Sequence, residues 1–231
     1  MPHELCVQQW PGLLAAALLL FVALLDRRRL RHQRDAARRA LDTARRDPLT
    51  GLANRALFVP AAQRLVDQRG DDSLVLMLDA NGLKTLNDSR GHAAGDALIC
   101  TIARRLETFV GDRGIVARLG GDEFAAVLHL PAADHHAALH DLAQAINQPM
   151  TLDGTELPVS AAIGAASPAT AGVRRVDGRP GLIRAADGAM YRSKHDPRPF
   201  DVGTEADANA DTLHGRRAGR PGTHLTAALA A

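Results

Sequence analysis

The chain has 231 residues, of which 46% are hydrophobic and 23% are charged, a composition suited to one globular domain with appended segments. Its two cysteines, Cys6 and Cys100, lie far apart in sequence, which argues against a disulfide framework or a thiolate metal site. The formal net charge is +2, and the positive charge is carried almost wholly by arginine, because Lys84 and Lys194 are the only lysines.

An apolar run from Trp10 to Leu25 predicts a membrane anchor within residues 1–25. Extended toward the N-terminus, it reaches the roughly 17–25 residues that a transmembrane helix needs. A cleaved signal peptide is the rival interpretation, but such peptides begin with basic residues, and residues 1–9 contain no Lys or Arg. The arginines follow the run, so the positive-inside rule predicts a single-pass protein with its N-terminus outside and the rest of the chain in the cytoplasm.

The segment from residue 26 to residue 46 is rich in arginine, contains no Gly or Pro, and predicts a basic connecting helix. Basic runs also occur in nucleic-acid-binding proteins, but the place of this one directly after an apolar helix favours contact with membrane lipid headgroups and no nucleic acid. Leu30, Ala37 and Ala44 recur every seven residues, which is a weak heptad. The helix therefore either pairs with its copy in a dimer or forms a solvated stalk, and the sequence leaves both interpretations open.

From Asp47 onward, helix and strand signals alternate. Gly120-Gly121 between two strands predicts a hairpin, and Pro60 is compatible with the first helix only within its first turn. This pattern favours an α+β fold, with a mixed central sheet flanked by helices and a β-hairpin turn, preceded by one transmembrane helix. Helices are predicted at residues 54–69, 93–109, 132–146 and 180–194, and strands at 74–78, 115–119, 124–130 and 157–165.

Residues 47–200 are predicted to form one domain. The segment 201–231 consists mostly of Ala, Gly, Thr, Asp and Arg without periodicity, so it is predicted to be a disordered tail.

Acidic residues stand at two positions where they are expected to meet. Asp79 follows a buried strand directly, and Asp122 and Glu123 lie at the tip of the predicted hairpin. If the hairpin pairs beside that strand, the carboxylates converge on one rim of the sheet. Oxygen ligands without imidazole or thiolate suit Mg²⁺ that arrives with a nucleotide phosphate. Solvated acids at turns are the alternative, which these residues alone leave open.

Four segments in chain order resemble motifs of GGDEF domains, the diguanylate cyclase family. A lone GGDEF string is a modest signal, whereas four ordered matches across residues 47–198 are specific. The segments are DPLTGLANR at Asp47–Arg55, DANGLKTLND followed by GH and GD within residues 79–96, RLGGDEF at Arg118–Phe124, and ADGAMYRSK at Ala186–Lys194.

The resemblance implies a homodimeric bacterial enzyme that condenses two GTP molecules into cyclic di-GMP and releases pyrophosphate. Together with the predicted anchor, this places the expected enzyme at the inner (cytoplasmic) membrane. A catalytically silent GGDEF domain that binds GTP or cyclic di-GMP and signals by contact is the alternative. Intact Asp79, Asp122, Glu123 and Lys84 argue against it, because a binding module has no need of metal carboxylates. A nucleotidyl cyclase of other specificity is a further alternative.

The resemblance also implies roles for single residues. The ligands of Mg²⁺, with Mn²⁺ as an alternative, are the carboxylates of Asp79 and Asp122 and the main-chain carbonyl of Ala80. Asp122 accepts the proton in catalysis, Glu123 assists or binds a second metal, and Lys84 contacts phosphates. Substrate binding involves the guanine-contacting pair Asn87 and Asp96, together with His92, Gly120, Gly121, Lys194 and Arg198.

The lysine positions support the resemblance independently. Both lysines of this arginine-rich chain fall on positions that contact phosphates in the family, where an ammonium point charge acts differently from a planar guanidinium.

The chain departs from the family pattern at two places. The family's inhibitory product site is an Arg-x-x-Asp that would occupy positions 111 and 114, but these are Gly111 and Gly114. Feedback inhibition through that site is therefore predicted to be absent. Pro197 stands where a glycine usually precedes Arg198, which leaves open whether Arg198 reaches the phosphates.

Overall fold

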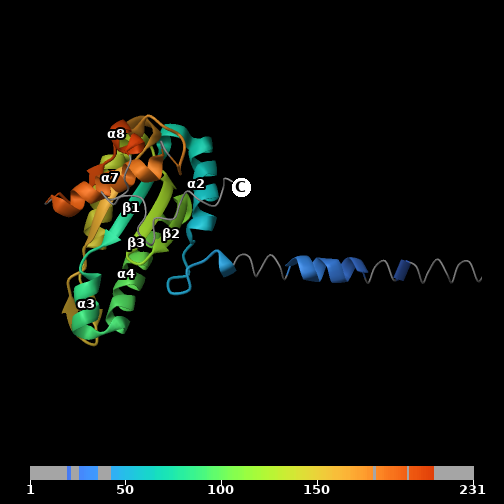
Figure 1. The fold of residues 1–231 in the computed structure, drawn as a ribbon, viewed down its shortest axis with the longest axis horizontal. Helices are drawn as coiled ribbons and strands as arrows, with labels where there is room; N and C mark the ends of the chain where they lie inside the picture. Colours follow the sequence, from blue (N-terminus) through green and yellow to red (C-terminus); the bar gives the residue numbers. More distant parts are fainter. Residues whose placement is uncertain (1–19, 22–25, 36–42, 179–180, 197, 211–231) are drawn as a thin grey trace, which may run out of the picture. The chain divides into compact units, whose positions relative to one another are not determined.

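The computed structural model describes residues 20–21, 26–35, 43–178, 181–196 and 198–210 (Figure 1). The chain divides into two compact units, Met1–Ala44 and Arg45–Ala231. In the first unit residues 26–35 are helical, in line with the predicted connecting helix. Among the described residues, no helix combines the length and the apolar character needed to cross a bilayer. Apart from Leu20 and Phe21, the predicted anchor lies outside the described residues.

A five-stranded sheet forms the centre of the second unit, with the strand order β2-β3-β1-β6-β7. β1 is antiparallel to both β3 and β6, β2 is antiparallel to β3, and β7 runs parallel to β6. The predicted mixed sheet is therefore confirmed. The strands are β1 (Ser73–Ala80), β2 (Gly114–Gly120), β3 (Glu123–His129), β6 (Ala161–Ala166) and β7 (Asp201–Val202).

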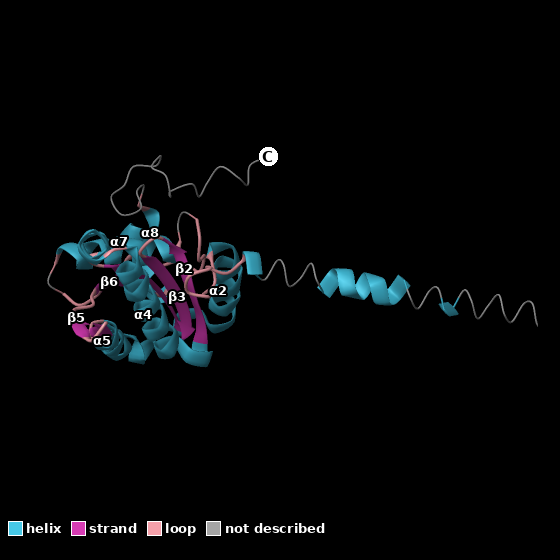
Figure 2. Cartoon of the chain, turned by 90° about the horizontal axis from the view of Figure 1, so that it is seen from below, coloured by secondary structure: helices cyan, strands magenta, loops and turns pink. Residues whose placement is uncertain are grey.

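Helices pack on both faces of this sheet (Figures 1 and 2). α4 (His92–Val110) and α5 (His135–Ile146) share one apolar core with the sheet, and α2 (Arg55–Arg69) and α7 (Leu182–His195) share the other. The two cores arise because successive side chains of a strand point to opposite faces.

Side-chain alternation along β1 determines which face its last carboxylate meets. Leu74, Leu76 and Leu78 belong to the core with α4 and α5, whereas Val75 and Met77 belong to the core with α7. Asp79 continues the second series, so its side chain lies on the α7 side of the sheet.

Several short elements were not predicted from the sequence. α3 follows β1 directly, and it buries none of its residues. A two-stranded hairpin follows α5, with Asp153 at φ 49° and Gly154 at φ 75° in its turn. These elements are α3 (Leu83–Arg90), β4 (Met150–Leu152), β5 (Thr155–Leu157), α6 (Pro168–Ala171) and α8 (Glu205–Asn209), with single 3₁₀ turns at Gly70–Asp72, Gly111–Arg113 and Ala132–Asp134.

The expectation for Pro60 was wrong. Pro60 is the sixth residue of α2, counted from Arg55, so it lies in the second turn. A proline there removes one intrahelical hydrogen bond, which normally weakens a helix. α2 nevertheless packs on the sheet through Phe58, Ala62 and Val66, each 0% exposed, and this burial offsets the lost bond.

The expectation of disorder from Asp201 onward was wrong for residues 201–209, whereas residues 211–231 lie outside the described residues. α8 begins with a capping box formed by Thr204 and Asp207. Arg192 of α7 donates hydrogen bonds to the carboxylates of Asp201 and Asp207, each at 2.6 Å. Ion pairs with α7 hold this stretch in place, which its composition alone does not reveal.

The Arg192–Asp207 pair predicts a loss of stability in acid. Burial raises the pKa of Asp207, but hydrogen bonds from Arg192 and Thr204 lower it further, so its pKa lies below the usual value of 3.8. Because the pKa of Asp207 is lower in the folded state, its ionised carboxylate stabilises the fold above pH 3.8. This stabilisation is lost as the pH falls through the folded-state pKa. We expect Asp207→Asn to lower the unfolding free energy at pH 7 by about 1–2 kcal/mol and to reduce its decline below pH 4, measured by urea unfolding. Equal pH dependence in both proteins would contradict this account.

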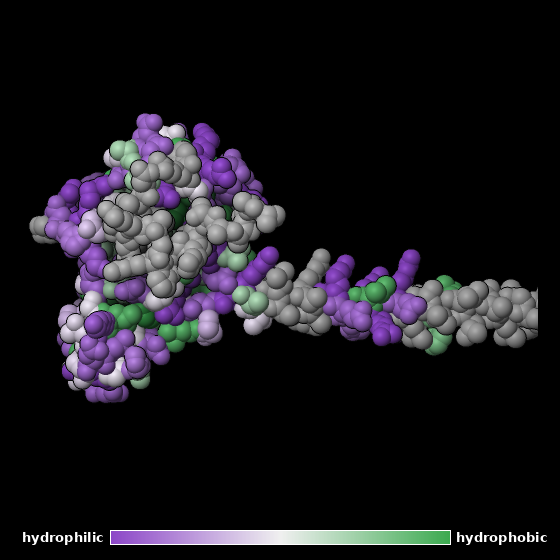
Figure 3. Space-filling model, in the orientation of Figure 1, coloured by the Kyte–Doolittle hydropathy of each residue, from purple (hydrophilic) through white to green (hydrophobic). Residues whose placement is uncertain are grey.

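Hydrophilic residues cover most of the described surface on the face drawn in Figure 3. The exposed large hydrophobic residues among the described ones are Leu20, Phe21, Leu30 and Tyr191. Of these, only Tyr191 belongs to the second unit, at 42% exposed on α7.

Candidate active site

The hairpin between β2 and β3 lies beside the end of β1, as expected from the sequence. Asp79 pairs with Glu123 in the β1–β3 ladder, and the N–H of Ala80 donates to the carbonyl of Asp122 at 3.0 Å. The acids of the hairpin tip and the acid of the strand end therefore share one rim of the sheet.

The hairpin turn depends on its two glycines. Gly120 has φ 153° and Gly121 has φ 53°, a region that residues with a Cβ rarely adopt. A bulge between Arg118 and Gly120 shifts the β2–β3 register just before the turn. Gly120 and Gly121 are exposed, so their main chain is open to a ligand.

The rim is crowded with negative charge. Asp79 is 4% exposed, and Lys194 of α7 donates to its Oδ1 at 2.7 Å. Burial and then the nearby charge of Asp79 raise the pKa of Asp122 above 3.8, and the charge of Lys194 offsets only part of this. Two carboxylates that repel each other in this way form a place where additional positive charge would be stabilising.

The residues at this rim fit a magnesium ion with an incomplete protein ligand set. Within the described ranges, no group of three or more His, Cys, Asp or Glu side chains is arranged to hold a metal. Mg²⁺ usually takes only one or two carboxylates from a protein and completes its shell with water and substrate phosphate. Asp79, Asp122 and the carbonyl of Ala80 match that pattern, and neither carboxylate belongs to a closed ligand cage.

The remaining predicted residues lie mainly on α3 and α4. Lys84 is exposed in the first turn of α3, and His92 and Asp96 are exposed in the first turns of α4. The Oδ1 of Asn87 is buried and has no hydrogen-bond partner, and a Cβ at Gly95 would lie 1.9 Å from it. Because Gly95 has no side chain, there is room for the Oδ1 of Asn87, which can still accept a hydrogen bond.

Arg198 points to acidic neighbours of its own segment. Its guanidinium lies 3.0 Å from Asp196 Oδ2 and 3.5 Å from Asp201 Oδ1. The structure therefore joins Asp79, Ala80, Asp122, Glu123 and Lys194 at one rim, whereas Arg198 pairs with Asp196 and Asp201.

Sequence reasoning missed the connection between the first motif and the hairpin. Arg118 donates to the carbonyl of Gly121 through Nε at 3.0 Å and Nη2 at 2.7 Å, and its Nη1 lies 3.2 Å from both carboxylate oxygens of Asp47. Asp47 also accepts from the N–H and hydroxyl of Thr50. Arg118 thus fixes the residue that precedes Asp122. The available signal was that two oppositely charged motif residues, Asp47 and Arg118, had no assigned role.

The contacts of Arg118 predict that Arg118→Met lowers catalytic activity, although Arg118 itself is not expected to touch the reacting atoms. We expect a loss of about 10- to 100-fold in kcat, because a displaced Gly121 carbonyl moves Asp122. Asp47→Asn should lower kcat less, and the double variant should fall short of the sum of the two effects in free energy, measured in a double-mutant cycle. Arg55→Met is the control, since Arg55 pairs with Asp177 at 2.9 Å and not with the hairpin. Strictly additive effects would contradict a shared role.

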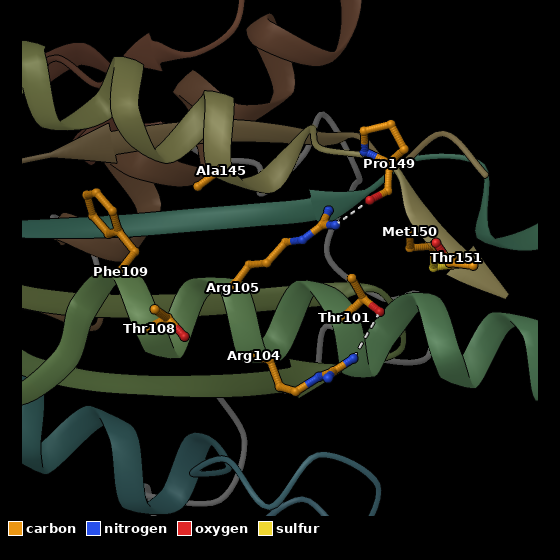
Figure 4. A pocket seen from close by; sticks show the side chains of 9 residues that line it. All are labelled: Thr101, Arg104, Arg105, Thr108, Phe109, Ala145, Pro149, Met150 and Thr151. Carbon is orange, nitrogen blue, oxygen red and sulfur yellow. Dashed lines mark hydrogen bonds between the residues drawn. The ribbon is translucent and has the colours of Figure 1, made fainter. Parts of the chain in front are cut away.

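A cavity of about 500 Å³ opens away from these residues, between α4, the end of α5 and β4 (Figure 4). Its lining includes Arg105, whose guanidinium donates to the carbonyls of Ile146, Gln148 and Pro149 at 2.5–2.8 Å. None of the predicted site residues lines it. The reaction site proposed from sequence is therefore an open rim of the sheet, distinct from this cavity.

A sequence profile of the family described as "Diguanylate cyclase, GGDEF domain" matches residues 44–199. The chain belongs to the GGDEF domain family. Its GGDEF domain is 43% identical over 157 residues to an uncharacterized 19.3 kDa protein of Streptomyces ambofaciens, a match that covers 68% of this chain and 81% of the relative. It is 38% identical over 160 residues to diguanylate cyclase DgcN of Escherichia coli K12, covering 67% of this chain and 38% of that one.

The GGDEF domain also resembles solved structures. The isolated GGDEF domain of TpbB from Pseudomonas aeruginosa aligns with a TM-score of 0.62 and 34% identity, covering 70% of this chain and 96% of that one. The coiled coil and GGDEF domain of DgcB from Caulobacter crescentus, in complex with c-di-GMP, aligns with a TM-score of 0.63 and 24% identity, covering 83% and 98%. The latter likeness shows the fold alone. Most of the curated relatives are much longer, since the match covers 21% of a Caulobacter vibrioides signaling protein and 26% of MucR of Pseudomonas aeruginosa.

Proposed function

We propose that this GGDEF domain condenses two GTP molecules into cyclic di-GMP and releases pyrophosphate. The observation that carries the proposal is the meeting of Asp79 and Asp122 at one rim of the sheet, directly beside the exposed glycine turn. Relatives named as diguanylate cyclases, DgcN and TpbB, support the assignment. A module that only binds nucleotide has no need of two carboxylates that repel each other.

The side chains at the rim suit the chemistry of phosphoryl transfer. In the proposed reaction, the 3′-hydroxyl of each GTP attacks the α-phosphate of the other and expels its pyrophosphate, so two phosphodiester bonds form and two pyrophosphates leave. Asp122 accepts the proton, with Glu123 beside it. Without a bound metal, the raised pKa of Asp122 makes its carboxylate a better proton acceptor than an ordinary aspartate. Lys84 and Lys194 would contact the phosphates. A divalent cation held by Asp79, Asp122 and the Ala80 carbonyl would supply charge neutralisation at the phosphates.

Guanine would bind between α3 and α4. The unpaired Oδ1 of Asn87 accepts from an amino or ring N–H donor, and the exposed carboxylate of Asp96 accepts from the ring N–H and amino group that adenine lacks as a pair. We assign His92, at the start of α4, to the same pocket. A site that leaves Asn87 unpaired without guanine should discriminate strongly against ATP.

Two copies of the domain are required by the proposed reaction. Each rim presents one GTP, so catalysis needs two domains face to face in an antiparallel arrangement. Leu30 of the connecting helix is 63% exposed, and pairing of this helix with its copy would cover it. Dimerisation is therefore the proposed point of control.

We further propose that residues 10–25 anchor the protein in the inner membrane, with residues 26–46 against lipid headgroups and the GGDEF domain in the cytoplasm. The apolar run and the arginines that follow it support this proposal. Membrane fractionation of cells that express the full chain tests it. Recovery of the protein in the high-speed supernatant without detergent would contradict it.

The activity is tested by incubating the purified full chain with Mg²⁺ and either GTP or ATP, followed by identification of the product. Cyclic di-GMP from GTP, and nothing from ATP, is the expected result. A GTP-binding protein without product would favour the silent alternative, and a cyclic product from ATP would favour another specificity.

Product feedback through the usual position is expected to be absent. Gly111 and Gly114 lack the side chains that would bind the product, and a Cβ at Gly114 would lie 1.8 Å from the backbone oxygen of Val127. We expect cyclic di-GMP added at micromolar concentration to leave initial rates unchanged within about twofold, since the nearby Asp112 and Arg113 stand in the reverse order and in another register. Strong noncompetitive inhibition would contradict this prediction.

A further inference from the structure

The ammonium group of Lys194 stands where a cation is expected beside Asp79. Lys194 Nζ donates to Asp79 Oδ1 at 2.7 Å. The side chain of Asp79 is 5% exposed, whereas that of Lys194 is 41% exposed. A nearly buried carboxylate thus depends on a partner whose far end can move into solvent.

Two carboxylates at the rim, those of Asp79 and Asp122, attract the ammonium group of Lys194. Among the described residues, Lys194 is the only Lys, Arg or His side chain within 4 Å of a carboxylate oxygen of Asp79. The other guanidinium at the hairpin, that of Arg118, is held by the Gly121 carbonyl and Asp47. Among the described residues, one positive charge, that of Lys194, therefore pairs with Asp79 and offsets part of the repulsion at Asp122, where a divalent cation would supply two.

Lysine is the side chain suited to give up such a contact. An ammonium is a strongly hydrated point charge on a flexible stem, whereas a guanidinium binds a carboxylate through two parallel hydrogen bonds. In a chain with only two lysines, the use of one at this position stands out against its general use of arginine.

We propose that Lys194 is an exchangeable substitute for the divalent cation at Asp79, which releases the carboxylate and turns to the nucleotide phosphates when metal and GTP bind together. The inference rests on the proposed function. Metal alone must displace the ammonium from Asp79, and nucleotide alone must draw the ammonium away and leave Asp79 and Asp122 without a cation. Only when metal and nucleotide bind together do the carboxylates, the ammonium group and the phosphates all have partners of opposite charge. Metal and nucleotide should therefore bind with positive coupling.

The experiment measures Mn²⁺ binding to the full chain without nucleotide, by electron paramagnetic resonance, in the wild type and in Lys194 variants. Lys194→Met should bind Mn²⁺ roughly tenfold more tightly than the wild type, because no ammonium competes for Asp79. Lys194→Arg should bind Mn²⁺ more weakly than the wild type, because a bidentate guanidinium holds the carboxylate more firmly. Asp79→Asn should abolish binding, which identifies the site.

The matched control is Lys84→Met. Lys84 is exposed on α3 and, in the described part of the chain, forms no ion pair. Both lysine-to-methionine variants should weaken binding of the α,β-methylene analogue of GTP, but Lys84→Met should leave Mn²⁺ binding without nucleotide unchanged. The increase in analogue affinity that Mn²⁺ causes should persist in Lys84→Met and largely disappear in Lys194→Met.

Unchanged or weaker Mn²⁺ binding by Lys194→Met would overturn the inference, as would binding that stays undetectable in both proteins. Opposite effects of the methionine and arginine variants would support it even if one of them is less stable. These measurements do not depend on product formation. If the domain makes no cyclic di-GMP, the proposed function is refuted, and the exchange of Lys194 at Asp79 is still tested by metal binding.

Discussion

Asp122→Asn is expected to abolish cyclic di-GMP synthesis while leaving the fold intact or more stable. Loss of a proton acceptor alone lowers kcat by about 10²- to 10⁴-fold, and the variant also loses one carboxylate assigned to the metal. The measurement is the initial rate of product formation from Mg²⁺ and GTP, with protein folding checked by circular dichroism. Asp112→Asn is the matched control, because Asp112 is an exposed acid in the turn after α4.

The stability effect of the same variant follows from the pKa of Asp122. Burial and the charge of Asp79 raise this pKa above 3.8, so ionisation costs more in the folded protein than in the unfolded chain. The fold therefore loses stability as the pH rises from 3.8 through the raised pKa. Asp122→Asn removes the charge, so its thermal midpoint without metal should equal or exceed that of the wild type. Undiminished product, or a lower midpoint together with lost activity, would contradict a catalytic role.

The main elements of the fold are predictable because each has a strong local pattern. The apolar run that ends at Asp79 is long enough to specify a buried strand, and the glycine pair at 120 and 121 specifies the hairpin beside it. α3 spans only Leu83–Arg90 and has no fully buried residue, and its two leucines, Leu83 and Leu86, make a pattern too short to specify a helix. The β4–β5 hairpin was detectable, since Asp153-Gly154 is a known turn pair, but its strands have three residues each.

The candidate site is predictable in its residues and much less so in its contacts. The motif matches identify Asp79 and Lys194, yet their hydrogen bond joins residues 115 positions apart. The contact between Arg118 and Asp47 spans 71 positions in the same way. Such pairings depend on the order of strands in the sheet and on which face α7 occupies, and neither is written in a local pattern.

Gly164→Ala is expected to cause a large loss of stability. A Cβ at Gly164 would lie 2.0 Å from the carbonyl oxygen of Ala186 and 2.2 Å from the amide nitrogen of Met190, both in the backbone of α7. Neither atom can move aside unless the whole helix moves. Overpacking costs about 1–3 kcal/mol, and contact with backbone places this variant at the upper end, which corresponds to roughly 6–12 °C in the thermal midpoint.

The same change should weaken substrate binding, because α7 carries Lys194. Displacement of α7 from β6 would move Lys194 away from the rim where the phosphates are proposed to bind, so the affinity for GTP should fall together with the thermal midpoint. Gly188→Ala is the matched comparison in the same helix, since its Cβ would meet side-chain atoms of Asp207, with Oδ1 nearest at 2.8 Å, and not the backbone of a neighbouring element, so its loss of stability should be smaller. A loss of stability in Gly188→Ala equal to that in Gly164→Ala would show that tight packing of α7 on β6 is not the cause.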